Sequence, residues 1–274
     1  MKCVILQGDG MADYPIESLG GNTPLQAAVT TNMDWLASHG SFGLTDTIPE
    51  GFPPGSDVGN MSILGYDPKQ YFTGRAPLEA ASMGVALRSE DIAFRCNLVT
   101  LWDGAPSPVM EDFTAGHISS EEGAKIIADL NRHLGGKDVE FYPGVSYRHL
   151  MVWRGGQGRM TTTPPHDITD RGIGSYLPAG DGSTFLLDLM ERSKKILSDH
   201  SVNRWREKNG KRKATSIWLW GQGKAPDFPS LKERFGLSGG VISAVDLING
   251  LGVYAGLERV SVPGVTGFFD TNYK

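Results

Sequence analysis

The sequence begins with an apolar run that ends in a carboxylate. Cys3 to Gln7 reads as nearly continuous apolar sequence rather than as an alternation, and Gly8, Asp9 and Gly10 follow directly. Such a run is typical of a central parallel strand that other elements cover on both faces. The 36 glycines among 274 residues suit a fold with many tight turns between strands and helices. We therefore expect an α/β fold with Asp9 at the carboxyl end of an interior strand.

A second segment, Gly55-Ser56-Asp57, predicts a serine at the N-terminus of a helix that begins at Asp57. A carboxylate at a strand end and a serine at a helix end are what a metal-activated nucleophile requires. The cation lowers the pKa of the hydroxyl, and the helix end attracts an anionic phosphoryl group. Taken singly, Asp9 also fits an ordinary turn and Ser56 an ordinary helix cap.

Charge and cysteine content exclude several classes of protein. A net charge of −5 argues against a surface that binds nucleic acid, and the basic cluster at residues 208–213 is short enough to be a solvated loop. Cys3 and Cys96 lie far apart in apolar segments, so we expect two buried thiols and no disulfide framework. The N-terminal run is too short for a signal sequence and no stretch approaches a membrane span, so we expect a cytoplasmic protein.

The pattern of elements predicts a module inserted into the α/β core. Residues 91–102 alternate between apolar and polar, which predicts an antiparallel strand with one face in water. A capping box at residues 119–122 opens a helix with one apolar face. We expect a discontinuous core of residues 1–87 and 178–274 around an α+β module of residues 88–177. Further predicted strands are 42–47, 139–142, 147–153, 216–220, 241–244 and 259–262, and further helices are 32–37, 183–199 and one from Asp246.

Several collinear motifs carry a family resemblance that covers essentially the whole chain. They are Asp9-Gly10-Met11-Ala12-Asp13, Gly55-Ser56-Asp57-Val58-Gly59-Asn60, Leu64-Gly65-Tyr66-Asp67-Pro68, Gly74-Arg75-Ala76-Pro77-Leu78-Glu79, Ala93-Phe94-Arg95-Cys96-Asn97 and Thr163-Pro164-Pro165-His166-Asp167. In this order they resemble the archaeal-type cofactor-independent phosphoglycerate mutases, and within them the bacterial branch also proposed to contain homoserine kinases.

The resemblance implies an alkaline-phosphatase-like fold, in which helices flank a mostly parallel sheet and an inserted smaller α+β domain binds substrate. It implies a glycolytic isomerase in which Ser56 takes the phosphoryl group of 3-phosphoglycerate or 2-phosphoglycerate, with glycerate rebinding to accept it. It also implies two divalent ions, Mn²⁺ or Zn²⁺, with Asp9 and Ser56 among the ligands, and no bisphosphoglycerate cofactor.

The chain departs from this family pattern at its end. Members of the family continue beyond the equivalent of Lys274 into a set of Asp and His residues that completes both metal sites. We therefore expect a C-terminally truncated chain that is inactive by itself. Asp199-His200 is not a substitute, because it lies at the end of a predicted helix, where a histidine suits the helix dipole.

Candidate substrate contacts come from the inserted module and its borders. Arg95 and Asn97 share one face of the strand at 91–102, and Arg148 offers a planar fork that grips phosphate bidentately. The family match adds Arg75, and Lys224 after a predicted strand is a weak phosphate contact. Without the family, a plain solvated sheet face is an equal explanation for Arg95 and Asn97.

One further candidate pair and two other functions complete these expectations. His166 and Asp167 follow two prolines and form a serviceable proton-transfer pair or a mere loop. The first alternative function is a phosphotransferase of the homoserine kinase kind that uses the same Ser56. The second is an inactive fragment that binds phosphorylated acids.

Overall fold

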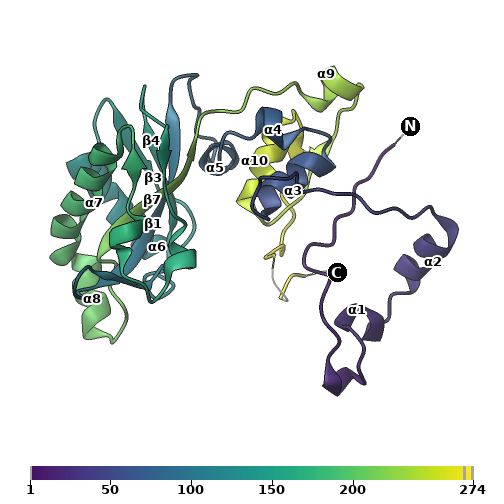
Figure 1. Ribbon diagram of the computed structural model, residues 1–274, viewed down its shortest axis with the longest axis horizontal. Helices are drawn as coiled ribbons and strands as arrows, with labels where there is room; N and C mark the ends of the chain where they lie inside the picture. Colours follow the sequence, from purple (N-terminus) through teal and green to yellow (C-terminus); the bar gives the residue numbers. More distant parts are fainter. Residues whose placement is uncertain (1, 268–269, 273–274) are drawn as a thin grey trace. The chain divides into compact units, whose positions relative to one another are not determined.

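The computed structural model describes residues 2–267 and 270–272 (Figure 1). The chain divides into two compact units, Met1–Asp46 and Thr47–Lys274.

The N-terminal unit has short helices and no core. It contains η1 (Glu17–Leu19), α1 (Pro24–Ala27) and α2 (Thr31–His39). Helix α2 confirms the helix predicted at 32–37 and ends at Gly40. No residue from 2 to 46 is buried.

The two strands predicted for this unit are not present in the structure. Residues 3–7 and 42–47 have no strand partner among the described residues, and Val4 and Leu6 are 86% and 89% exposed. Cys3 is exposed as well, so the predicted buried thiol is wrong at this position. A parallel strand requires a neighbour for its N–H and C=O groups and a cover on both faces, and residues 2–46 supply neither to one another.

The second unit is built on an antiparallel sheet centred on β1 (Ile92–Trp102). On one side β1 pairs with β4 (Arg148–Trp153), which in turn pairs with β3 (Val139–Tyr142). On its other side β1 pairs with β7 (Ser216–Gly223), and its far end pairs with β2 (Val109–Asp112). These strands confirm the predictions for 91–102, 139–142, 147–153 and 216–220.

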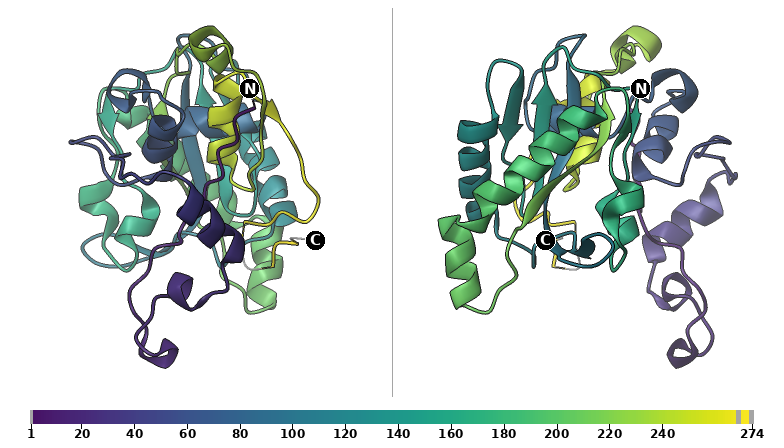
Figure 2. Two further views of the ribbon diagram at one scale, coloured as in Figure 1. Left: turned by 90° about the vertical axis from the view of Figure 1, so that its right-hand side faces the viewer. Right: turned by 60° about the vertical axis from the view of Figure 1, so that its left-hand side comes forward.

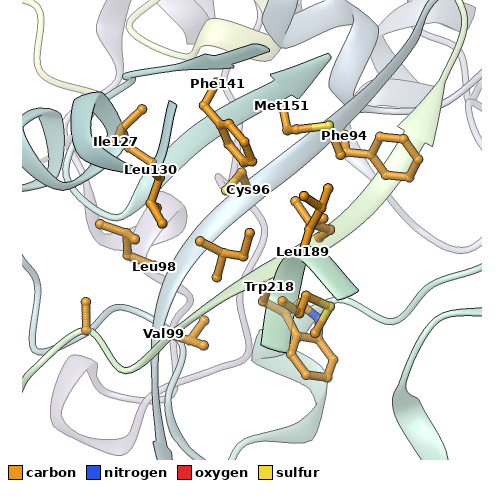
Figure 3. Packing of buried hydrophobic residues seen from close by; sticks show 14 of the residues in the cluster. Phe94, Cys96, Leu98, Val99, Ile127, Leu130, Phe141, Met151, Leu189 and Trp218 are labelled. Atoms are coloured by element: carbon orange, nitrogen blue, oxygen red, sulfur yellow. The ribbon is translucent and has the colours of Figure 1, made fainter. Parts of the chain in front are cut away.

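One face of this sheet carries the main core. Phe94, Cys96 and Leu98 of β1 pack under α6 (Ser120–Leu134) and α7 (Ser183–Ser198) (Figure 3). Figure 2 shows α7, in green in its right-hand view, running across the strands. The predicted capping box is present, because Ser119 and Glu122 bond to each other's backbone N–H groups. Cys96 is buried as predicted.

The opposite face is also covered, which corrects the prediction of a wet face. Helix α5 (Ala76–Ser82) packs Ala76 and Ala80 against Ala93 of β1 and against Leu150 and Val152 of β4. Consequently β1 is buried from Ile92 to Thr100 on both faces. Alternation of residue types identified the two faces but not the helix that covers the second one.

The sheet also bears on the expected module boundary at residue 177. Strand β7 and helix α7 lie beyond that boundary, yet β7 is hydrogen-bonded to β1 and α7 covers the same core. We therefore propose that the sheet module ends after β7. Two short strands and two 3-10 turns lie between β4 and α7. The strands are β5 (Met160–Thr161) and β6 (Ala179–Gly180), and the turns are η2 (Pro165–Ile168) and η3 (Ile173–Tyr176).

The rest of this unit is a helical cluster with a second core. It contains α3 (Ser56–Ile63), α4 (Pro68–Tyr71), α9 (Leu231–Phe235) and α10 (Asp246–Tyr254). Helix α10 packs closely on α5, because a Cβ atom at Gly250 would collide with the backbone carbonyl of Leu78. Strands β8 (Gly240–Val241) and β9 (Glu258–Arg259) are the one parallel pair among the described residues. The other strand pairs in the described part of the chain are antiparallel, so of the predicted parallel sheet only this pair is seen there.

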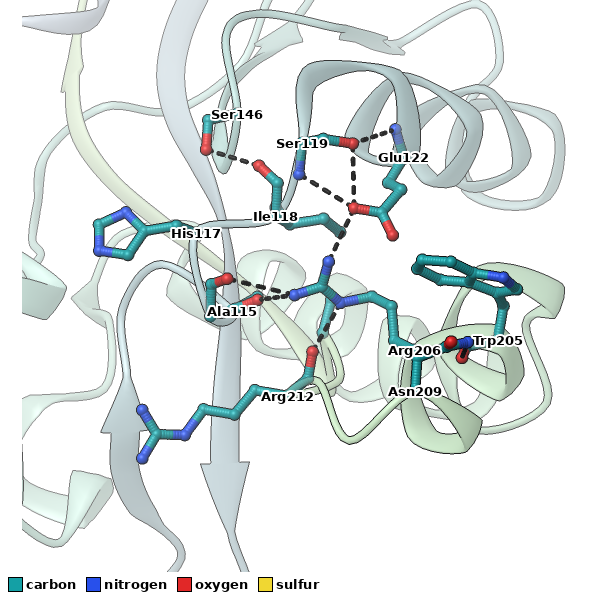
Figure 4. Close-up of polar contacts among 12 residues, drawn as sticks. Ala115, His117, Ile118, Ser119, Glu122, Ser146, Trp205, Arg206, Asn209 and Arg212 are labelled. Atoms are coloured by element: carbon teal, nitrogen blue, oxygen red, sulfur yellow. Dashed lines mark hydrogen bonds and ion pairs between the residues drawn. The ribbon is translucent and has the colours of Figure 1, made fainter.

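A buried arginine closes the corner between α6 and α8 (Ser201–Lys208). Arg206 is 1% exposed, and its guanidinium donates to Glu122 and to the backbone carbonyls of Ala115, Gly116 and Arg212 (Figure 4). All three of its nitrogens are used, so this arginine is a structural clamp.

The Asp199-His200 pair lies at the end of α7, as predicted, but its histidine has a different role. Asp199 caps the end of α7, but His200 is the N-cap residue of α8, where its Nδ1 accepts from the N–H of Val202. The other ring nitrogen of His200 pairs with Asp129 at 3.0 Å. The imidazole therefore supports the next helix rather than the end of the preceding one.

The described residues thus form a mixed α/β fold, as predicted. No helix in the described parts of the chain is long and apolar enough to cross a membrane.

Candidate functional site

The candidate site lies on the face of β1 opposite the main core. In the strand register Arg95 stands across from Trp220 of β7, and Asn97 stands across from Arg148 of β4. Residues directly opposite each other in an antiparallel pair point to the same side of the sheet. The sheet therefore brings two predicted arginines onto one face and adds a tryptophan that the sequence analysis did not single out.

Helix α5 adds the third arginine and a carboxylate. Arg75 is the N-cap residue of α5, and Glu79 lies one turn further on. One carboxylate oxygen of Glu79 lies 2.9 Å from Nε of Arg95, and the other lies 3.6 Å from Nε of Arg75. Glu79 was also missed in the sequence, although its spacing of four residues from Arg75 is that of a helical ion pair.

Two glycines set the start of α5 against the end of β7. A Cβ atom at Gly74 would collide with the carbonyl of Gln222, and one at Gly223 would collide with the carbonyl of Thr73. The two backbones therefore touch, and only residues without a side chain permit this approach. The contact lies directly before Arg75, so it fixes where that side chain leaves the helix.

The guanidinium groups of Arg75, Arg95 and Arg148 make no hydrogen bonds to the described residues. Among the described residues no N–H group of Arg75, Arg95 or Arg148 makes a side-chain hydrogen bond, and the contact of Arg95 with Glu79 is an ion pair without hydrogen-bond geometry. Arg95 is only 6% exposed. Its pKa is lowered by burial, and Arg75 and Arg148 act in the same direction while Glu79 opposes them. Glu79 pairs with two of these cations, Arg75 and Arg95, and the charge of Arg148 also acts on Arg95, so net positive charge is left for an anion.

His166 lies on a loop that β7 holds in place. The Thr162 hydroxyl donates to Oε1 of Gln222 at 2.7 Å, and Nε2 of Gln222 donates back to the carbonyl of Met160 at 2.6 Å. Trp218 Nε1 donates to the carbonyl of Thr163 at 2.8 Å. These bonds tie the loop to the strand that carries Trp220.

The His166 ring sits between aromatic side chains and remains partly open to solvent. Its centroid lies 5.5 Å from that of Trp220 and 5.9 Å from that of Phe113, and the side chain is 44% exposed. Burial, with the nearby charges of Arg95 and Arg75, lowers the pKa of His166, although Asp167 at 3.6 Å acts in the opposite direction. A neutral imidazole at neutral pH can accept a proton from a bound hydroxyl group.

Asn97 has a different environment from the one expected for a ligand contact. It is 2% exposed, its Oδ1 accepts from Nε1 of Trp220 at 3.0 Å, and its Nδ2 donates to the carbonyl of Phe113 at 3.3 Å. Both ends of the amide are occupied, so its contacts support the aromatic side chains of the site.

Lys224 lies at the margin of this site. Its Nζ pairs with Glu90 at 3.0 Å, and its carbonyl accepts from the Thr73 hydroxyl. No contact joins Lys224 to the three arginines among the described residues.

Ser56 and Asp9 lie in different units of the chain. Ser56 is exposed and is the first residue of α3, which begins one residue earlier than predicted. The cap position belongs to Gly55 and no side chain caps the helix, so the interpretation of Ser56 as an N-cap is wrong. Its hydroxyl has no hydrogen-bond partner in the described part of the chain. Asp9 is exposed in a turn, as its Gly-Asp-Gly sequence suggested.

The residues present do not make a metal centre by themselves. Mn²⁺ and Zn²⁺ sites usually gather three or more His, Cys, Asp or Glu side chains. No such group of three occurs among residues 2–267 and 270–272. The chemistry available from the described residues is therefore anion binding by arginine, proton transfer by His166 and an uncommitted hydroxyl on Ser56.

Comparison with known proteins identifies a single family. The profile described as 2,3-bisphosphoglycerate-independent phosphoglycerate mutase matches residues 37–203. A probable enzyme of that name from Geobacter sulfurreducens is 54% identical over the whole chain, and one from Methanosarcina barkeri is 56% identical. The chain spans 69% and 68% of the lengths of these two relatives.

Solved structures agree with this result. A protein from Pyrococcus horikoshii is 28% identical with a TM-score of 0.74, covering 96% of this chain and 62% of its own. The cofactor-independent phosphoglycerate mutase of Thermoplasma acidophilum is 31% identical with a TM-score of 0.57, covering 93% of this chain and 68% of its own. The chain thus spans less than two thirds of the Pyrococcus protein.

Proposed function

The chain belongs to the family of 2,3-bisphosphoglycerate-independent phosphoglycerate mutases, and on this premise we propose that it contributes to an isomerase that interconverts 3-phosphoglycerate and 2-phosphoglycerate. The family name specifies independence from bisphosphoglycerate. The relatives reported above carry no kinase name, so the homoserine kinase alternative has no support. We also propose a cytoplasmic location, where phosphorylated acids of central metabolism are made and used.

The observation that carries the proposal is the set of unused guanidinium donors. Phosphoglycerate has a carboxylate and a phosphate, and both are planar or forked acceptors that match arginine. Arg75 and Arg95 pair with Glu79, the charge of Arg148 acts on Arg95, and none of the three guanidinium groups makes a hydrogen bond to the described residues. We assign to them the binding of the carboxylate and the phosphate of the substrate.

Ser56 is the proposed phosphoryl acceptor. Its hydroxyl stands at the first position of α3, where the free N–H groups of a helix attract an anionic phosphoryl group. In the first step the Ser56 oxygen bonds to phosphorus, the bond from phosphorus to the substrate oxygen breaks, and glycerate is released into the site. The serine gives up one proton and the leaving oxygen gains one.

His166, with Asp167 beside it, is the proposed proton carrier of the second step. The other hydroxyl of glycerate attacks the phosphoserine, its proton passes to the neutral imidazole, and the Ser56 oxygen leaves phosphorus and takes up one proton. The arginines retain glycerate by its carboxylate between the two steps, so the intermediate rebinds before it escapes.

The two metal ions implied by the family do not fit the described residues alone. We propose that Asp9 and Ser56 contribute to metal binding together with side chains from outside the described residues. The 274-residue chain is then expected to bind Mn²⁺ or Zn²⁺ weakly, to bind 3-phosphoglycerate, and not to turn it over. Titration calorimetry with each ligand tests this, and tight metal binding by the chain would contradict it.

Turnover is tested with the natural gene product that contains these residues. With Mn²⁺ and an enolase-coupled assay, it should convert 3-phosphoglycerate without added bisphosphoglycerate. Ser56→Ala should abolish turnover and the phosphorylated form seen by intact mass, whereas Ser62→Ala, a change later in the same helix, should retain both. An active Ser56→Ala enzyme would disprove the assignment of the nucleophile.

A further inference from the structure

We propose that Trp220 is a positioning residue that orients the guanidinium of Arg95 and the imidazole of His166, and that Asn97 fixes the indole in the required orientation. The inference rests on the proposed function, because Arg95 and His166 are the groups assigned there to the phosphorylated acid. It concerns residues that hold those groups rather than residues that touch the substrate.

Trp220 holds Arg95 without using its donors. Cζ of Arg95 lies 4.4 Å from the centroid of the indole, in the range of a cation–π contact, and Cζ of Arg75 lies at 6.0 Å. A guanidinium stacked on an aromatic face keeps its N–H groups in the plane of the fork, free for a bidentate acceptor. Arg206 shows the alternative, because carbonyl and carboxylate acceptors hold it and use its donors.

The indole itself is held by a side-chain hydrogen bond. Trp220 is 4% exposed, and its Nε1 donates to Oδ1 of Asn97, two residues from Arg95 along β1. Asn97 is anchored in turn by the carbonyl of Phe113. This bond sets the rotation of the indole about its χ angles, so the plane on which Arg95 stacks is defined before any ligand binds.

The same indole contacts His166. The two rings meet at 70° with a centroid separation of 5.5 Å, an edge-to-face arrangement. The proposed proton carrier and the proposed anion-binding arginine therefore share one support. A change in Trp220 should therefore displace both groups.

The test compares Trp220→Leu, Trp220→Phe and a matched control, Trp205→Leu. Trp205 is 50% exposed and contacts Lys211, which has no part in the site. Titration calorimetry with 3-phosphoglycerate should show about tenfold weaker binding for Trp220→Leu, a loss within the range measured for cation–π contacts. Trp220→Phe keeps an aromatic face and should recover most of the affinity, and Trp205→Leu should bind like the original chain.

A second readout needs no ligand. The NMR resonance of the His166 Hε1 proton senses the ring current of a neighbouring indole, so it should shift in Trp220→Leu and stay in place in Trp205→Leu. If Trp220→Leu does not fold, Asn97→Ala takes its place, with a smaller loss of affinity and a shift of the same resonance expected.

The outcomes separate the two proposals. Unchanged affinity and an unchanged His166 resonance in a folded Trp220→Leu chain would overturn the positioning role. Equal losses of affinity in Trp220→Phe and Trp220→Leu would overturn it as well, because the aromatic face would then not matter. If the original chain fails to bind 3-phosphoglycerate, the proposed function fails, and the His166 resonance still decides whether Trp220 positions that ring.

Discussion

Two buried arginines in the second unit differ in what their guanidinium groups contact. Arg206 is 1% exposed and donates from all three nitrogens to Glu122 and to backbone carbonyls. Arg95 is 6% exposed and has one ion pair, one aromatic face and no hydrogen bond among the described residues. Burial of a charge is costly unless it is paired and hydrogen-bonded. The described residues supply hydrogen-bond acceptors for every nitrogen of the Arg206 guanidinium and none for that of Arg95, which supports the proposal that a ligand supplies them.

This difference separates an arginine of the fold from an arginine of the site. Removing Arg206 should destabilise the protein and leave ligand binding intact, whereas removing Arg95 should do the reverse.

The largest effect is expected for Arg206→Met. The change leaves Glu122 and several buried carbonyls without their partner, which should lower the free energy of unfolding by about 3–5 kcal/mol. Urea denaturation measures this loss, with Arg204→Met at an exposed position of the same helix as the control. A loss below about 1 kcal/mol would show that the clamp carries little stability.

Arg95→Met should reverse that pattern. We expect affinity for 3-phosphoglycerate to fall about 100-fold, or about 2.7 kcal/mol, because a buried charge-assisted pair is lost. The free energy of unfolding should change by less than about 1 kcal/mol, since a buried cation that makes no hydrogen bond to the described residues is replaced by an apolar chain and Glu79 keeps its pair with Arg75. Calorimetry and urea denaturation measure the two quantities, with the exposed Arg192→Met as the control. Strong destabilisation with intact binding would make Arg95 a second structural arginine.

A buried histidine on the core face predicts how stability depends on pH. Burial lowers the pKa of His149 to about 3, and its Nδ1 accepts from the N–H of Gly144. The unfolded chain binds this proton below about pH 6.5. The stabilisation of the folded chain that comes from the neutral form of His149 is therefore fully present above pH 6.5, and it is lost as the pH falls toward 3.

The expected loss from this histidine between pH 7 and pH 5 is about 2 kcal/mol. His149→Gln should abolish that part of the pH dependence, and the exposed His133→Gln should leave it in place. Urea denaturation at both pH values gives the comparison. If the free energy of unfolding depends on pH equally in His149→Gln and in the original chain, groups other than His149 cause that dependence.

Lys224→Met should have the smallest effect. Lys224 pairs with Glu90 at an exposed position, where such a pair contributes at most about 1 kcal/mol. We expect affinity for 3-phosphoglycerate to change by less than about twofold, within about 0.4 kcal/mol. A tenfold loss would restore Lys224 as a phosphate contact and extend the site beyond the three arginines. Glu90→Gln, which removes the partner, serves as the matched control.

The local elements of the second unit could be predicted from sequence because their signals are local. The capping box at Ser119 and Glu122 and the alternation along β1 each depend on a few neighbouring residues. The cover of β1 by α5 could not be predicted this way, because it depends on contacts between residues far apart in the chain. The two strands expected in residues 2–46 failed for the same reason, since a strand exists only with its neighbours.

The residues of the candidate site could likewise be predicted only in part from the local sequence. Arg95 and Arg148 were identified by residue type, and the sheet places them on one face. Trp220 and Glu79 were missed because their roles depend on β7 lying beside β1 and on α5 lying over the sheet. Once β7 is paired with β1, the alternate positions of Trp218 and Trp220 point to this face.

The most direct test of the central claim is a crystal structure of the chain with 3-phosphoglycerate bound. The account predicts the acid against the N–H groups of Arg75, Arg95 and Arg148, with Arg95 still stacked on Trp220. A ligand held elsewhere, with these guanidinium groups still lacking an acceptor, would contradict it.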